Sequence, residues 1–170
     1  GFDPIKDDSA LHAVLGYMPQ KFGLYEDLTV MENLNLYADL RSVTGDVREK
    51  TFARLLEFTS LGPFTGRLAG KLSGGMKQKL GLACTLVGEP KVLLLDEPAA
   101  GMTDAETEYT AELFRTLAGQ HSLMVVEHDM GFVETIADRV TVLHQGQVLA
   151  EGSLREVQAN EQVIEVYLGR

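Results

Sequence analysis

The chain has 170 residues, of which 45% are hydrophobic and 24% charged, and its formal net charge is −10. This length suits one domain with a sizeable buried core, and the apolar fraction is too high for a disordered chain. The excess of acidic residues disfavours binding to nucleic acids, because their phosphates would repel it. The single cysteine, Cys84, excludes an internal disulfide. We expect it to lie on a helix and to pack in the protein core.

The first half of the chain predicts one strand followed by three helices. Capping residues mark two helix starts, Thr29 with Glu32 for the first helix and Ser73 for the third. The second helix has an amphipathic pattern that ends at Gly62-Pro63, a pair that stops helices. The predicted elements are a strand at residues 14–17 and helices at residues 30–37, 46–61 and 74–87.

In the second half, aliphatic runs alternate with helical patterns. The two continuous runs at residues 91–95 and 123–126 are typical of parallel strands that are covered on both faces. The other predicted elements are strands at 140–143 and 148–150 with a turn at Gln145-Gly146, and helices at 104–118, 129–137, from 154 onward and at 162–168. Capping boxes at residues 103–106 and 153–156 mark the starts of two of these helices. Strands that alternate with helices predict an α/β fold with a parallel sheet and an all-helical insert at residues 21–87.

Two adjacent carboxylates, Asp96 and Glu97, follow the buried strand at residues 91–95. Ligands bind at the carboxyl ends of the strands in open α/β sheets, and two ionised carboxylates there are unfavourable unless a cation or a proton transfer compensates. Asp96 suits the shell of a Mg²⁺ ion that is shared with phosphate oxygens. Glu97 suits the polarisation of a water that attacks a phosphoryl group. The alternative is an ordinary acidic strand end.

Three further elements are ambiguous when each is taken alone. Residues 72–78 (LSGGMKQ) place a serine and two glycines at a helix start, which favours an anion site but also fits a capped helix after a glycine turn. Gln20 and His128 each follow a predicted strand. A single polar residue at a strand end is usually structural.

The order of Gln20, residues 72–78, Asp96-Glu97 and His128 resembles the ATP-binding cassette (ABC) ATPases in spacing and composition, over the whole chain. By this resemblance Asp96 would be the Walker B aspartate that holds Mg²⁺, and Glu97 the catalytic glutamate. Gln20 would be the Q-loop glutamine, which senses Mg²⁺ and the attacking water. His128 would be the switch histidine at the γ-phosphate of ATP.

The same resemblance assigns a second set of residues to a nucleotide that is bound by an opposite subunit. Ser73, Gly74 and Gly75 would belong to the signature motif and contact the γ-phosphate. Thr103 would align with the aspartate of the family's D-loop, and Asp104 stands one place later.

The fold implied by the resemblance is a partial P-loop NTPase domain over residues 1–170. Residues 21–87 would be its helical subdomain, and residues 1–20 and 88–170 the RecA-like α/β part. The implied partners are transmembrane permease subunits and a second ATPase subunit in a head-to-tail dimer, with no nucleic acid. The implied location is cytoplasmic, on the inner face of the cell membrane.

The sequence departs from the family in one respect that bears on activity. It contains no G-x-x-x-x-G-K-[ST] phosphate-binding loop, and the nearest pattern, at residues 66–72, has the wrong glycine spacing. We therefore expect the chain to be inactive alone and to correspond to part of an ATPase. The alternative function is a non-catalytic module that donates only its signature motif.

The two halves of the chain resemble different branches of this family. Residues 1–98 contain all of the lysines and are similar to ATPases of ABC-2-type exporters. Residues 99–170 are similar to importers of the branched-chain amino-acid and urea type. We therefore consider a hybrid joined near Pro98 as a hypothesis.

Overall fold

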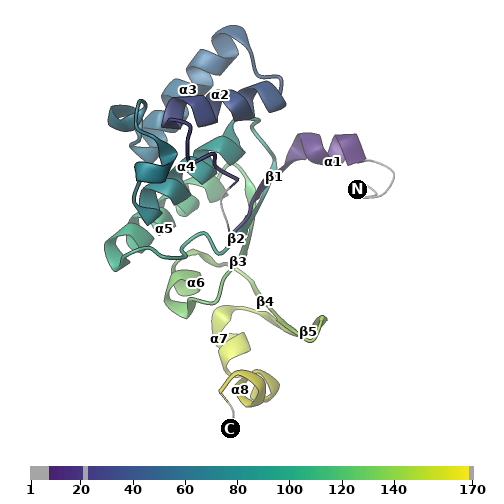
Figure 1. Ribbon diagram of the computed structural model, residues 1–170. Coiled ribbons are helices and arrows are strands. Elements are labelled where there is room, and N and C mark those ends of the chain that lie inside the picture. The colour runs from purple at the N-terminus through teal and green to yellow at the C-terminus, as the bar shows by residue number, and fades with distance from the viewer. Residues whose placement is uncertain (1–7, 21–22, 169–170) are drawn as a thin grey trace. The chain divides into compact units, whose positions relative to one another are not determined.

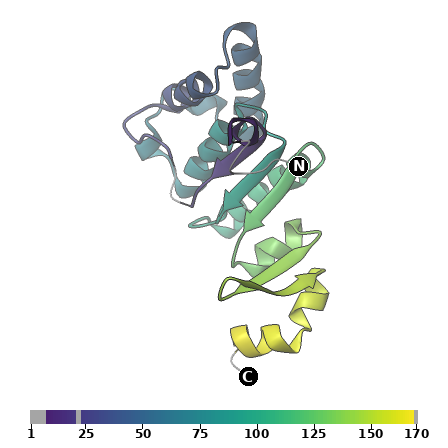
Figure 2. The same cartoon turned by 90° about the vertical axis from the view of Figure 1, so that its right-hand side faces the viewer.

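The computed structural model describes residues 8–20 and 23–168, which fall into two compact units, Gly1–Asp129 and Met130–Arg170. Figure 1 and Figure 2 show the helices and strands of both units. Among the described residues, no helix combines the length and the apolar character that crossing a membrane would require.

A three-stranded parallel sheet forms the centre of the first unit. Its strands are β1 (Leu15–Met18), β2 (Val92–Asp96) and β3 (Ser122–Val126), in the order β1-β2-β3. The strands start level with one another and run the same way, so their carboxyl ends meet at one edge of the sheet. This arrangement confirms the α/β class with a parallel sheet.

The helices of the first unit include a group that lies between β1 and β2 in the sequence. A short helix, α1 (Asp8–Val14), precedes β1, and α5 (Asp104–Ala118) connects β2 to β3. Between β1 and β2 lie α2 (Val30–Leu40), α3 (Gly45–Thr59), two short 3₁₀ turns (Gly62–Phe64 and Ala69–Lys71) and α4 (Gly74–Leu86).

One face of the sheet is buried, and the other is largely open. Leu93 and Leu95 of β2 are fully buried, and α4 and α5 contact the sheet on the same side in Figure 1. On the alternate positions, Tyr17 of β1 and Met124 of β3 are more than half exposed. The expectation of strands covered on both faces is therefore wrong within the described residues, because those helices pack on one side only.

The second unit consists of a hairpin and three short helices. These are α6 (Met130–Ile136), β4 (Val140–His144), β5 (Gln147–Gly152), α7 (Leu154–Gln158) and α8 (Glu161–Leu168). The turn residues Gln145 and Gly146 both have positive φ, which is the geometry of a tight antiparallel hairpin. The Tyr167 hydroxyl donates to the carbonyl of Leu143 and so ties α8 to β4.

Several predicted element ends differ from the observed ones by one to three residues, and two of these differences have a clear structural cause. The second helix ends at Thr59 rather than at Gly62-Pro63, because Ser60 takes a left-handed conformation (φ 58°) and Pro63 instead starts a 3₁₀ turn. The strand predicted at residues 14–17 begins one residue later, since Val14 closes the unpredicted helix α1. The predicted capping boxes at Thr29 and Thr103 are both present.

Candidate functional site

The carboxyl ends of the three parallel strands bring polar residues to one edge of the sheet. Gln20 lies two residues after β1, Asp96 ends β2, and His128 lies two residues after β3. Asp96 is half-buried and pairs in register with Val126. This edge is where open α/β sheets bind their ligands.

Glu97 lies at the centre of this group. Its Oε2 accepts a hydrogen bond of 2.5 Å from Nε2 of Gln20, and its Oε1 lies 3.8 Å from Nδ1 of His128. Its backbone is left-handed (φ 45°), which costs a non-glycine residue about 1 kcal/mol. Two main-chain hydrogen bonds hold this conformation. The Glu97 N–H donates to the Val126 carbonyl, and the Glu97 carbonyl accepts from the Ala100 N–H. The structure therefore brings Gln20, Glu97 and His128 together.

A second group of predicted residues surrounds the start of α4. The Ser73 hydroxyl caps this helix by accepting from the Met76 N–H, and it donates to Oε1 of Glu106 at 3.2 Å. A Cβ atom at Gly75 would collide with the Glu106 carboxylate, and one at Gly74 would lie 3.0 Å from the carbonyl oxygen of Gly101. The two glycines therefore allow the start of α4 to pack closely against α5 and the loop before it.

Glu106 links this helix start to the start of α5. Its Oε2 accepts from the Thr103 N–H (3.0 Å) and hydroxyl (3.1 Å), and Thr103 caps α5 in return, while Asp104 is the exposed first residue of that helix. The hydrogen bonds from the Thr103 N–H and hydroxyl are the main reason why the pKa of Glu106 lies below 4.5. Burial opposes them, and the Ser73 hydroxyl and the Lys79 charge add smaller lowering effects.

Replacing Glu106 by glutamine should therefore destabilise the fold in a pH-dependent way. Because the folded state lowers the pKa of Glu106, the stability it contributes is complete above pH 4.5 and is lost as the pH falls through the folded-state pKa. The difference in thermal midpoint between Glu106→Gln and the parent should shrink between pH 7 and about pH 3. Glu108→Gln, an exposed change on the same helix, is the control, and equal pH profiles for both variants would contradict this expectation.

Two residues at the strand edge were not singled out from the sequence. Glu127 follows β3, and its side chain is only 2% exposed. Gln78 of α4 is buried, and its Nε2 lies 3.5 Å from the carbonyl oxygen of Glu97. Asp96 was predicted because it ends a run of apolar residues. Glu127 follows a similar run, and this pattern is the signal that could have identified it.

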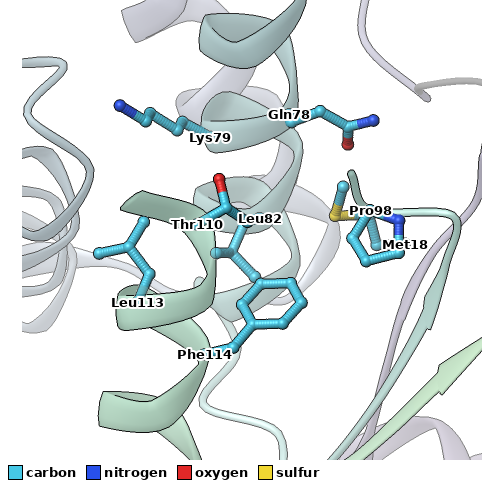
Figure 3. A pocket seen from close by; sticks show the side chains of 8 residues that line it. All are labelled: Met18, Gln78, Lys79, Leu82, Pro98, Thr110, Leu113 and Phe114. Atoms are coloured by element: carbon cyan, nitrogen blue, oxygen red, sulfur yellow. The ribbon is translucent and has the colours of Figure 1, made fainter. Parts of the chain in front are cut away.

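Gln78 also lines a small cavity between α4, α5 and the strand ends, shown in Figure 3. The lining side chains are those of Met18, Gln78, Lys79, Leu82, Pro98, Thr110, Leu113 and Phe114. The lining is mostly apolar, and the cavity has room for roughly one water molecule. It is therefore too small to be the site of a nucleotide. Within the described residues, the Gln78 Oε1 is buried without a hydrogen-bond partner.

Cys84 of α4 is 2% exposed, as predicted for a core residue. Burial raises the pKa of its thiol far above the ordinary value, so the reactive thiolate is disfavoured. Cys84 thus has a packing role.

Comparison with protein families identifies two segments. Residues 3–100 match a family described as ABC transporter, and residues 147–170 match one described as branched-chain amino acid ATP-binding cassette transporter. The first match spans more than half of the chain and includes Gln20, residues 72–78 and Asp96-Glu97.

Individual relatives agree with the family match. The probable multidrug ABC transporter ATP-binding protein YbhF of Escherichia coli (strain K12) is 67% identical over 153 residues, which cover 89% of this chain and 26% of that protein. The high-affinity branched-chain amino acid transport ATP-binding protein BraF of Pseudomonas aeruginosa is 32% identical over 88% of this chain and 66% of that protein. The chain thus spans about a quarter of the length of YbhF. The YbhF alignment necessarily includes residue 98, and the join near Pro98 stays a hypothesis.

Solved structures share the fold. The ADP conformation of an ATP-binding cassette of an ABC transporter superposes with a TM-score of 0.80 at 26% identity, over 95% of this chain and 71% of that one. The family match, the relatives and the shared fold agree with one another. The chain therefore belongs to the ABC transporter family and has the fold of its ATP-binding cassettes.

Proposed function

We propose that this chain is part of the ATP-binding and ATP-hydrolysing subunit of a bacterial ABC transporter, which powers transport through a membrane partner. Domains of this family generally bind nucleotide. The observation that supports the proposal most is the convergence of Gln20, Glu97 and His128 at the edge of the sheet, with Asp96 beside them. A module that only donated its signature motif would not need this arrangement.

Glu97 is the proposed general base. In hydrolysis, a water oxygen forms a bond to the γ-phosphorus while the bond from that phosphorus to the β–γ bridging oxygen breaks, which gives ADP and phosphate. The Glu97 carboxylate orients the attacking water and accepts its proton. Gln20 holds one oxygen of this carboxylate, and His128 lies beside the other. From there His128 would contact the γ-phosphate.

Asp96 and Gln20 fit a Mg²⁺ ion that is shared with the nucleotide. Mg²⁺ binds through one or two carboxylates and keeps phosphate oxygens and waters as its other ligands, and it neutralises the charge on the phosphates. Asp96 supplies a carboxylate at the end of β2. The Gln20 amide nitrogen binds Glu97, and the carbonyl oxygen is the atom through which an amide ligates a cation.

Ser73, Gly74 and Gly75 are proposed to contact the nucleotide of a second ATPase subunit in a head-to-tail dimer. Ser73 and Gly74 are exposed at the start of α4, where backbone N–H groups favour an anion. Thr103 and Asp104 begin the adjacent helix and would lie in the same interface.

The proposed domain division follows from the same assignment. Residues 21–87 would form the helical subdomain that docks on a transmembrane permease, and residues 1–20 and 88–170 would form the RecA-like part. ATP-binding subunits of this family generally work with permease components. The proposed location is therefore the cytoplasmic face of the membrane, and no nucleic-acid partner is proposed.

The test is the Mg²⁺ dependence of ATP hydrolysis in a chain that carries these residues together with a G-x-x-x-x-G-K-[ST] loop. Asp96→Asn should raise the Mg²⁺ concentration for half-maximal hydrolysis by at least about tenfold, because a neutral amide ligates the ion more weakly. The exposed substitution Asp46→Asn, on α3, is the control. A parent chain that neither binds nor hydrolyses ATP would contradict the proposal.

A further inference from the structure

Glu127 is a carboxylate that the fold buries directly after β3. Its side chain is 2% exposed, whereas that of the next residue, His128, is 79% exposed. A buried carboxylate is unfavourable unless hydrogen bonds compensate for the lost water. The partners of Glu127 therefore explain why it is there.

Both oxygens of Glu127 accept hydrogen bonds from backbone N–H groups. Oε1 accepts from the N–H of Ala99 at 2.9 Å, and Oε2 accepts from the N–H of His128 at 3.2 Å. Ala99 belongs to the loop after β2 and His128 to the loop after β3. The side chain thus joins the two strands just beyond their last main-chain contact, which runs from Glu97 N to the carbonyl of Val126.

This contact bears on the distance between His128 and Glu97. Because the His128 imidazole is mostly exposed, its place beside Glu97 depends on where its backbone is held. Glu127 holds that backbone and, at the same time, the peptide two residues after Glu97. The Glu127 Oε2 also lies 4.0 Å from Nδ1 of His128, so both carboxylates lie near the same ring nitrogen.

We propose that Glu127 is a positioning residue: its carboxylate fixes the loops after β2 and β3 to each other and so keeps His128 beside Glu97. The structural part of this proposal concerns the described contacts alone. The consequence for turnover rests on the function proposed above. The two parts therefore need separate readouts.

The first experiment measures amide hydrogen exchange by NMR, residue by residue, in the 170-residue chain. Glu127→Gln offers one acceptor oxygen, and its NH₂ group faces the second N–H, so at least one of the two hydrogen bonds is lost. The amide of Ala99 or His128 should exchange about tenfold faster or more, as expected for the loss of a hydrogen bond to a charged group. The amides of Glu97 and Ala100, which bind main-chain oxygens, should keep their rates.

Two controls make this result decisive. Glu112→Gln removes the same charge from an exposed position on α5 and should change none of the four rates. Glu127→Asp keeps the charge but is one methylene shorter, so the amide of Ala99 or His128 should again exchange faster. This variant replaces Glu127→Gln if that one does not fold. Unchanged rates at both amides, or equal acceleration at all four, would overturn the proposal.

The second experiment uses the ATP-hydrolysing chain with its phosphate-binding loop. Glu127→Gln should lower kcat with little change in the KM for ATP, since it acts through His128 and not on substrate binding. In a chain that already carries His128→Ala, the Glu127→Gln substitution should lower kcat little further. If the two substitutions instead lower kcat by factors that multiply, Glu127 does not act through His128. If no variant or parent hydrolyses ATP, the proposed function fails, while the exchange experiment still decides the structural claim.

Discussion

Replacing Glu97 by glutamine should abolish ATP hydrolysis and leave ATP binding intact, in a chain that includes a phosphate-binding loop. The amide has nearly the shape of the carboxylate and keeps an oxygen that can accept from Nε2 of Gln20. It cannot accept a proton from the attacking water, so turnover should fall at least about 100-fold. Steady-state hydrolysis and equilibrium binding of ATP measure the two effects separately.

The matched control for this variant is Glu89→Gln. Glu89 also has a left-handed backbone (φ 49°), but its carboxylate makes a surface ion pair with Arg54 at 2.7 Å. Exposed pairs of this kind contribute little, so turnover should stay at the parent value. Undiminished turnover in Glu97→Gln would show that Glu97 is not the general base.

Local sequence signals predicted the elements of this fold well. The capping boxes at Thr29, Thr103 and Ser153 each involve residues only three positions apart, and all three are present. The runs of aliphatic residues that predicted the strands are also signals between neighbours in the sequence. The end of α3 was missed because Ser60, a residue without a strong left-handed preference, takes the position that glycine usually fills.

Contacts within the site were less accessible to sequence reasoning. The strand ends and the family resemblance pointed to Gln20, Glu97 and His128. The parallel sheet brings Gln20 to Glu97 across 77 residues of sequence. The hydrogen bonds from Ser73 to Glu106 and from Ala99 to Glu127 join residues 33 and 28 positions apart. Such pairs depend on how the loops pack, and no periodicity or spacing in the sequence encodes them.

Replacing Asn33 by leucine should cause a large loss of stability. Asn33 is fully buried in α2, and its Oδ1 accepts from the N–H of Tyr25 while its Nδ2 donates to the carbonyl groups of Tyr25, Leu28 and Thr29. Leucine fills the same space but leaves the Tyr25 N–H and these carbonyls without their side-chain partner. The free energy of unfolding should fall by about 2–4 kcal/mol, as measured by urea denaturation.

Asn35→Leu, on the same helix, separates this effect from helix propensity and hydrophobicity. Asn35 is half-buried, and its side chain donates to the Met31 carbonyl one turn earlier, so its loss should change stability by about 0.5 kcal/mol or less. The turn that Asn33 holds also carries Glu26, whose carboxylate pairs with Lys77 of α4 at 2.6 Å. Equal stability losses in the two variants would contradict the view that Asn33 anchors the turn at residues 25–28 to α2.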